Sequence, residues 1–153
     1  MRIWWQIPVL VLLLCCFGLS KTESLADLKA HADSAAGGEQ AKFCIEYAHA
    51  ELEYANELYT KGDVDQAQSA VNSVMEYVRK GTTAAESSGK RLKQTEIELR
   101  KLEKRMKDIG ESLNLDDRPP VLKLVDEIEQ LRAGLLAAMF GPQAEPRGKS
   151  REC

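Results

Sequence analysis

The stretch Gly81–Lys90, GTTAAESSGK, decides the fold of this 153-residue chain. Its two glycines and its serine and threonine residues give it the composition of a linker. Helical patterns nevertheless lie on both sides, and apolar or small residues continue through it at alternating steps of three and four. Because a linker has no reason to keep this phase, we predict one helix from about residue 63 to 114. A kink or break at the glycines, each of which costs about 1 kcal/mol relative to alanine, is the alternative.

The predicted long helix carries one continuous apolar seam. Its a-type and d-type positions are occupied by Val64, Ala67, Val71, Val74, Val78, Gly81, Ala85, Ser88, Leu92, Thr95, Leu99, Leu102, Met106, Ile109 and Leu113. The small residues Gly81, Ala85 and Ser88 would let the backbone of another helix approach closely. A strict seven-residue period also predicts coiled-coil-like packing with a left-handed supercoil.

Shorter helices are predicted before and after the long one. Residues 39–61 carry two adjacent apolar rows, and so wide an arc must contact more than one neighbour. Residues 119–140 repeat the three-and-four spacing and end at Gly141, and a weaker helix over residues 21–36 ends at Gly37. No segment shows the two-residue alternation of a strand. We therefore predict an all-α fold of antiparallel helical hairpins that share one long central helix.

The turn that joins the first hairpin lies in Leu58–Ala67, LYTKGDVDQA. Gly62 can adopt the left-handed conformation that ends a helix, and Asp63 can cap the helix that follows. This stretch resembles the helix–turn–helix junction of tetratricopeptide repeats, and the resemblance implies an antiparallel helical hairpin. No second copy follows at the repeat spacing of about 34 residues, so we do not expect a repeat array.

The first 20 residues, MRIWWQIPVLVLLLCCFGLS, have the pattern of an export signal. Arg2 provides the positive start, an apolar core follows, and the small residues Gly18 and Ser20 suit cleavage after residue 20. The apolar run is short for a membrane span, which needs about 20 residues. A second cleavage site at Ala26 and retention of the segment as a membrane anchor are the alternatives. We expect the protein to be periplasmic or secreted.

The exported part would comprise one helical domain, residues 21–141, and a disordered polar tail, residues 142–153. The whole chain has 21 Lys and Arg against 24 Asp and Glu, a net charge of −3, which argues against nucleic acid as a partner. Cys44 and Cys153 are the cysteines outside the predicted signal. They imply no disulfide scaffold, and whether either forms a disulfide is left open.

Glu46 and His49 have the Glu-x-x-His spacing of helical di-metal proteins, and Glu53 follows one turn later. All three fall on the polar arc of their helix, and His31, the other histidine, has no glutamate three residues before it. We therefore favour a solvated polar face and keep a metal site as a weak alternative. With no nucleophile arrangement and no phosphate-binding glycine loop, the sequence predicts neither an enzyme nor a cofactor or small-molecule substrate.

Glu51 differs from its neighbours because it projects near the middle of the apolar arc, between Tyr47 and Leu58. A lone buried carboxylate is costly unless it is paired or hydrogen-bonded. We expect an ion pair or a hydrogen bond from a tyrosine at this position.

The charges of the second half of the chain are divided between two segments. Residues 90–107 have a net charge of +5, and residues 108–129 have a net charge of −5. Five cations of the first segment are predicted to point outward: Lys93, Arg100, Lys101, Lys104 and Lys107. They form either a solubilising face or a patch for an anionic surface. The expected role is structural or protein-interacting, with another protein or a second copy as partner; the alternative is peripheral binding to an anionic envelope surface through these cations.

Overall fold

The computed structural model describes residues 24–141, so the predicted signal (1–20) and the predicted tail (142–153) lie outside the described residues. Within that range the fold is all-α, with no strand. The helices are α2 (Leu25–Ser34), α3 (Gly37–Lys61), α4 (Val64–Ser88), α5 (Leu92–Ser112) and α6 (Arg118–Phe140). None of these helices is both long enough and apolar enough to cross a membrane.

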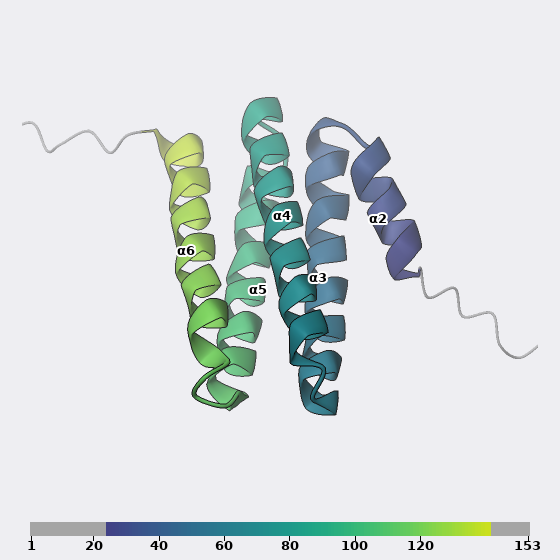
Figure 1. Ribbon diagram of the computed structural model, residues 1–153. Helices are drawn as coiled ribbons and strands as arrows, with labels where there is room; N and C mark the ends of the chain where they lie inside the picture. Colours follow the sequence, from purple (N-terminus) through teal and green to yellow (C-terminus); the bar gives the residue numbers. More distant parts are fainter. Residues whose placement is uncertain (1–23, 142–153) are drawn as a thin grey trace, which may run out of the picture.

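The predicted single helix over residues 63–114 is wrong, because α4 ends at Ser88 and α5 begins at Leu92. Gly89 (φ 64°) and Arg91 (φ 61°) both adopt the left-handed conformation, which stops the first helix and turns the chain. The hydroxyl of Ser88 donates to the carbonyl of Ala84 at 2.6 Å and accepts from the Lys90 amide at 3.3 Å. After this turn α5 runs back antiparallel to α4 (Figure 1).

The apolar spacing of three and four residues continues through the turn, but its cause is not a continuous helix. Most seam residues of both helices are buried, including Val71 and Val78 of α4 and Leu99 and Met106 of α5, whereas Val64 at the start of α4 is exposed. All four belong to one apolar core that also contains residues of α3 and α6. Folding back lets both seams share this core, whereas a straight rod would offer each seam a single short partner helix. Each helix therefore has the three-and-four spacing because it buries its own apolar face in the shared core.

Antiparallel hairpins are confirmed in both halves of the structure. The first joins α3 to α4 at Gly62, whose left-handed backbone (φ 85°) lets its amide bond back to the carbonyls of Leu58 and Tyr59. Asp63 lies at the start of α4, but its side chain makes no capping hydrogen bond, so the predicted cap is wrong. The second hairpin joins α5 to α6 through a short turn after Leu113.

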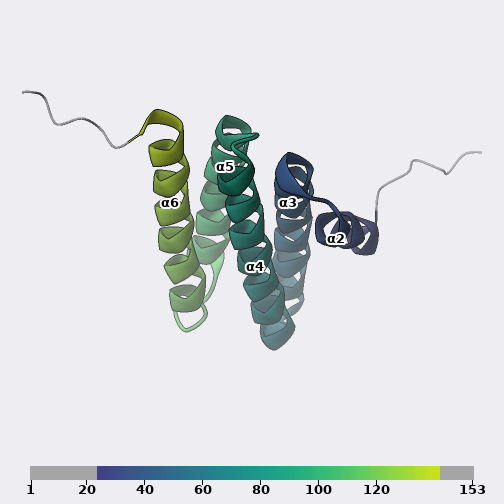
Figure 2. The ribbon, with the colours of Figure 1, turned by 90° about the horizontal axis from the view of Figure 1, so that it is seen from above.

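The two hairpins pack so that α3 lies beside α5 and α4 beside α6 (Figures 1 and 2). Two ion pairs join α3 to this part of the chain: Arg91, just before α5, pairs with Glu39, and Arg105 of α5 pairs with Glu53, both at 2.7 Å. In each pair the two residues are 52 positions apart, so α3 and α5 run parallel. This parallel alignment creates the groove described below.

The close helix approach that the sequence predicted is observed at Gly81. A Cβ atom there would lie 3.0 Å from Cys44 Cβ and 3.3 Å from the carbonyl oxygen of Ala41, both on α3. Ala85, one turn later, is fully buried. The small residues of residues 81–90 therefore allow α3 of the same chain to pack closely against α4.

Helix α2 packs on the outer side of α3 and α4 (Figure 2). It begins with a capping box in which Ser24 and Asp27 bond each other's backbone amides. At its other end Asp33 accepts a hydrogen bond from the Tyr77 hydroxyl at 2.8 Å and pairs with Lys80 at 2.6 Å. The helix ends at Ser34, and Gly37, which was predicted to end it, instead begins α3.

Candidate functional site

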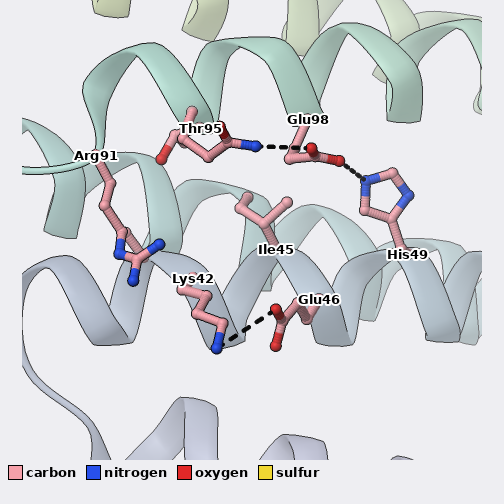
Figure 3. A pocket seen from close by; sticks show the side chains of 9 residues that line it. Lys42, Ile45, Glu46, His49, Arg91, Thr95 and Glu98 are labelled. Carbon is pink, nitrogen blue, oxygen red and sulfur yellow. Dashed lines mark hydrogen bonds and ion pairs between the residues drawn. The ribbon is translucent and has the colours of Figure 1, made fainter.

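A half-open groove of about 330 Å³ lies between α3 and α5, and we call it the α3/α5 groove (Figure 3). It is lined by Ala41, Lys42, Ile45, Glu46 and His49 of α3, by Gln94, Thr95 and Glu98 of α5, and by Arg91 of the turn before α5. Ala41 and Ile45 belong to the apolar core and give the groove an apolar floor. The polar side chains surround this floor, so the groove combines an apolar surface with charged edges.

One end of the groove is formed by His49 and Glu98, which face each other from the two helices (Figure 3). The imidazole Nε2 lies 3.7 Å from the Glu98 Oε2 atom, which is too long for a hydrogen bond, and Nε2 is buried without a hydrogen-bond partner. Burial lowers the pKa of His49, and the nearby Glu98 carboxylate only partly opposes this effect. Burial therefore favours the neutral form of the imidazole.

The Glu98 carboxylate is held by its own helix. Its Oε1 atom accepts hydrogen bonds from Gln94 Nε2 at 3.0 Å and from Lys101 Nζ at 2.9 Å. Its second oxygen, Oε2, faces His49 without a hydrogen bond from it. This end of the groove therefore presents a fixed carboxylate with spare accepting capacity, and Glu46 adds a second carboxylate nearby.

The other end of the groove is cationic. Arg91 bonds Glu39 through one guanidinium nitrogen at 2.7 Å, and its side chain is 39% exposed. Lys42 lies beside it on α3 and pairs loosely with Glu46 at 3.8 Å. Arg91 is also the one non-glycine residue with a positive φ between residues 24 and 141, and this backbone conformation orients its side chain.

A second hollow of about 270 Å³ adjoins the cationic end, lined by the first residues of α3 together with Lys90 and Arg91. The residue before α3, Ala36, has no side chain that could cap the free amides of the first turn. This second hollow therefore adds the positive charge of Lys90 and the free backbone amides of the first turn of α3 to the cationic end of the groove.

The sequence prediction of a solvated α3 polar arc was wrong for one of its three residues, His49. His49 is half-buried against α5, with its Nε2 atom buried. Glu53 is exposed, as predicted, and pairs with Arg105 at 2.7 Å. In a single long helix, the residues of α5 would extend away from α3. The turn at Gly89 instead places α5 beside α3. Glu46 is exposed, and within residues 24–141 no three His, Cys, Asp or Glu side chains are arranged to hold a metal ion.

The five predicted interaction cations all lie on α5 and are exposed: Lys93, Arg100, Lys101, Lys104 and Lys107. Three of them pair with carboxylates of α5 itself, Arg100 with Glu96, Lys101 with Glu98 and Lys107 with Glu111. Lys93 and Lys104 form no ion pair with any residue that the structure describes. The patch is therefore neutralised in part by its own helix.

Glu51 is buried, at 8% exposure, as its place in the apolar arc predicted. Burial raises the pKa of its carboxyl group, and the Tyr47 hydroxyl and the charge of Lys29 act in the opposite direction. The carboxyl group lines a separate shallow hollow between α3 and α4, which also contains Tyr54 and Asp65. The hydrogen bond that the Tyr47 hydroxyl makes in the structure is with Ser73 Oγ at 3.2 Å, so the expected bond from a tyrosine to Glu51 stays a prediction. Glu51 is not part of the α3/α5 groove.

The residues that α5 contributes to the groove carry no distinctive local sequence pattern. Gln94 and Glu98 flank the apolar seam of α5 like many solvated residues, and nothing local marks them. The available signal in the sequence was that two pairs of opposite charges, Glu39 with Arg91 and Glu53 with Arg105, are each 52 residues apart. This equal spacing has a meaning only when the two helices are known to lie side by side. Comparison with protein-family models, with curated proteins and with solved structures finds no match for this chain.

Proposed function

We propose that this is an exported, non-enzymatic helical protein that acts in the cell envelope by binding another protein, and that the α3/α5 groove is its binding surface. The observation that carries the proposal is the groove itself, with its apolar floor at Ala41 and Ile45 and its charged edges. Protein interfaces commonly combine an apolar centre with a polar rim. Grooves between helices accept peptide segments in this way.

The sequence supports the location. Residues 1–20 have a positive start, an apolar core and small residues at the expected cleavage site. Export would place the groove in the periplasm or outside the cell. Fractionation of cells that produce the full chain, with mass determination of the protein, tests this part: a chain that stays full-length in the cytosol contradicts it.

Site-specific photo-crosslinking tests the binding surface. A photoreactive residue at Gln94, which lines the groove, is compared with the same residue at Gln130, which is exposed on α6. We expect a discrete adduct from Gln94 in intact cells and none from Gln130, and the Gln94 adduct should disappear when Glu98 is replaced by lysine. An adduct with twice the mass of the chain would identify a second copy as the partner and would also support the proposal. Equal adducts from both positions, or none from Gln94, would contradict it.

A second candidate function is peripheral binding to an anionic envelope surface. Lys93 and Lys104 favour it, because both are exposed on α5 and neither is paired with a described residue. A lysine near an anionic membrane contributes about 1 kcal/mol. Changing both to glutamine should therefore weaken binding to vesicles of anionic phospholipid by about 2 kcal/mol, roughly 30-fold.

The matched control for this vesicle experiment changes Lys61 and Lys123 to glutamine, since both are exposed away from the α5 face. It should leave vesicle binding unchanged, and added salt should weaken the binding of the unaltered protein. Binding that resists salt, or that responds equally to both pairs of substitutions, would exclude this alternative.

A further inference from the structure

The charges along the α3/α5 groove are separated by sign. The two cations of the lining, Lys42 and Arg91, lie toward one end, and the two carboxylates, Glu46 and Glu98, lie toward the other (Figure 3). At a rise of about 1.5 Å per residue, the step from residue 42 to 46 spans roughly 6 Å and that from 91 to 98 roughly 10 Å. The backbone positions that carry opposite charges are thus about 6 to 10 Å apart. The Lys42 and Glu46 side chains bend toward each other to 3.8 Å, but this exposed pair is weak and can be shared with a ligand.

An extended peptide segment has the matching dimensions. Residues i and i+2 of an extended strand project to the same side, roughly 7 Å apart. We infer that the groove recognises an extended segment of a partner protein with an acidic side chain and a basic side chain two residues apart. The acidic side chain lies at the Arg91 end, and the basic side chain at the Glu98 end. This inference rests on the proposed function and specifies the chemistry of its partner.

The ion pairs already present do not block this recognition. Glu39 occupies one nitrogen of Arg91, and a guanidinium group has further donors. Lys101 and Gln94 occupy Oε1 of Glu98, which leaves Oε2 without a hydrogen bond. Glu39 and Lys101 are exposed, at 58% and 63%, so their pairs are weak and can be shared with a ligand.

The residues around the Glu98 end keep it acidic. His49 faces Glu98 from α3 at 3.7 Å, and its burial lowers its pKa and so favours its uncharged form. Lys101 supplies one positive charge from α5, and Glu46 and Glu98 supply two negative charges. Lys42, which pairs with Glu46, offsets part of this negative charge. A basic side chain of the partner therefore meets chiefly the free Oε2 atom of Glu98 at this end, above the apolar floor.

Nuclear magnetic resonance with short peptides tests the inference on the exported chain, purified from the envelope fraction of cells grown on nitrogen-15. The probes are an end-blocked Asp-Ala-Lys peptide and an end-blocked Asn-Ala-Gln peptide of the same shape without charge. We expect amide shifts confined to the groove with the charged peptide, and none with the neutral one. Shifts outside the groove, or equal shifts with both peptides, would overturn the inference.

Two double variants of α3 provide a matched comparison. Lys42 and Glu46 form an i,i+4 pair at 3.8 Å in the groove, and Glu57 and Lys61 form one at 3.9 Å outside it. Changing the first pair to glutamine should weaken binding of the charged peptide about threefold or more, as the loss of exposed ion pairs predicts, while the second change should have no effect. Equal effects of the two changes would contradict the inference.

The peptide and crosslinking experiments separate the two proposals. If Gln94 forms its adduct but the charged peptide does not bind the groove, the partner chemistry is wrong and the binding surface stands. If neither occurs, both proposals fail.

Discussion

Replacing Gly81 with alanine measures how closely α3 and α4 pack. An added Cβ would lie 3.0 Å from Cys44 Cβ, 3.2 Å from Ile45 Cδ1 and 3.3 Å from the carbonyl oxygen of Ala41. Two of these atoms are fixed to the α3 backbone, so the helices must move apart, and overpacking of this kind costs about 1–3 kcal/mol. Alanine gains about 1 kcal/mol over glycine within a helix. The net change in unfolding free energy should therefore lie between about zero and a loss of 2 kcal/mol.

Gly134 of α6 provides the control, since it is also inside a helix. A Cβ there would meet a single nearby atom, Glu86 Oε1 at 3.2 Å, at the end of an exposed and flexible side chain. Gly134→Ala should keep most of the helix-propensity gain and stabilise the protein by up to about 1 kcal/mol.

Urea unfolding followed by circular dichroism measures both variants. We expect Gly134→Ala to raise the midpoint and Gly81→Ala to lower it or leave it unchanged, with a difference of at least about 1 kcal/mol between them, or roughly 4 °C in thermal midpoint. If Gly81→Ala stabilises the protein as much as Gly134→Ala does, α3 and α4 do not pack closely at Gly81, and close helix packing is not the reason for the small residues of residues 81–90.

Three further changes test other contacts. Tyr77→Phe removes a hydrogen bond to Asp33 worth about 1 kcal/mol, so the amides of α2 should exchange with deuterium faster, while unchanged exchange would mean that this bond does not hold α2. Burial raises the pKa of Glu51, so its ionised form destabilises the fold as pH rises above the ordinary glutamate pKa of about 4.3. Glu51→Gln should therefore raise the urea midpoint at pH 7 and have little effect below pH 4. An equal gain in the midpoint at both pH values would refute this explanation. Arg132→Leu leaves Glu96, which is 4% exposed, without its partner from α6 and should cost about 1–3 kcal/mol in thermal unfolding, more than an exposed ion pair contributes.

Local sequence was sufficient to identify most helices and one of the turns. The apolar rows of α3 and α6 repeat every three or four residues, which predicted these helices to within a few residues of their bounds. Gly62 was identified as a turn because a left-handed glycine ends a helix by a local mechanism. The burial of Glu51 also followed from its position within one helix, since neighbours three and four residues away define the face.

Gly89 shows where the local pattern was not sufficient. A glycine within a helix costs only about 1 kcal/mol, so the sequence there is compatible with both a continuous helix and a turn. The decision depends on the apolar surface that each arrangement buries, and burial of a single leucine contributes about 1.5–3 kcal/mol. Leu99 and Leu102 of α5 become fully buried in the shared core once the chain turns back. The free energy gained by burying several such side chains is larger than the free-energy difference that Gly89 makes to a local helix.

The sequence by itself determined the helices, their apolar faces and the antiparallel hairpins, because these depend on residues close together in the chain. The tertiary structure alone decided that α5 lies parallel to α3, and with it the meeting of His49 and Glu98 and the α3/α5 groove. The physical reason is that residues about fifty positions apart meet through the packing of whole helices, and the energy of that packing is distributed over the core instead of being recorded in any short stretch.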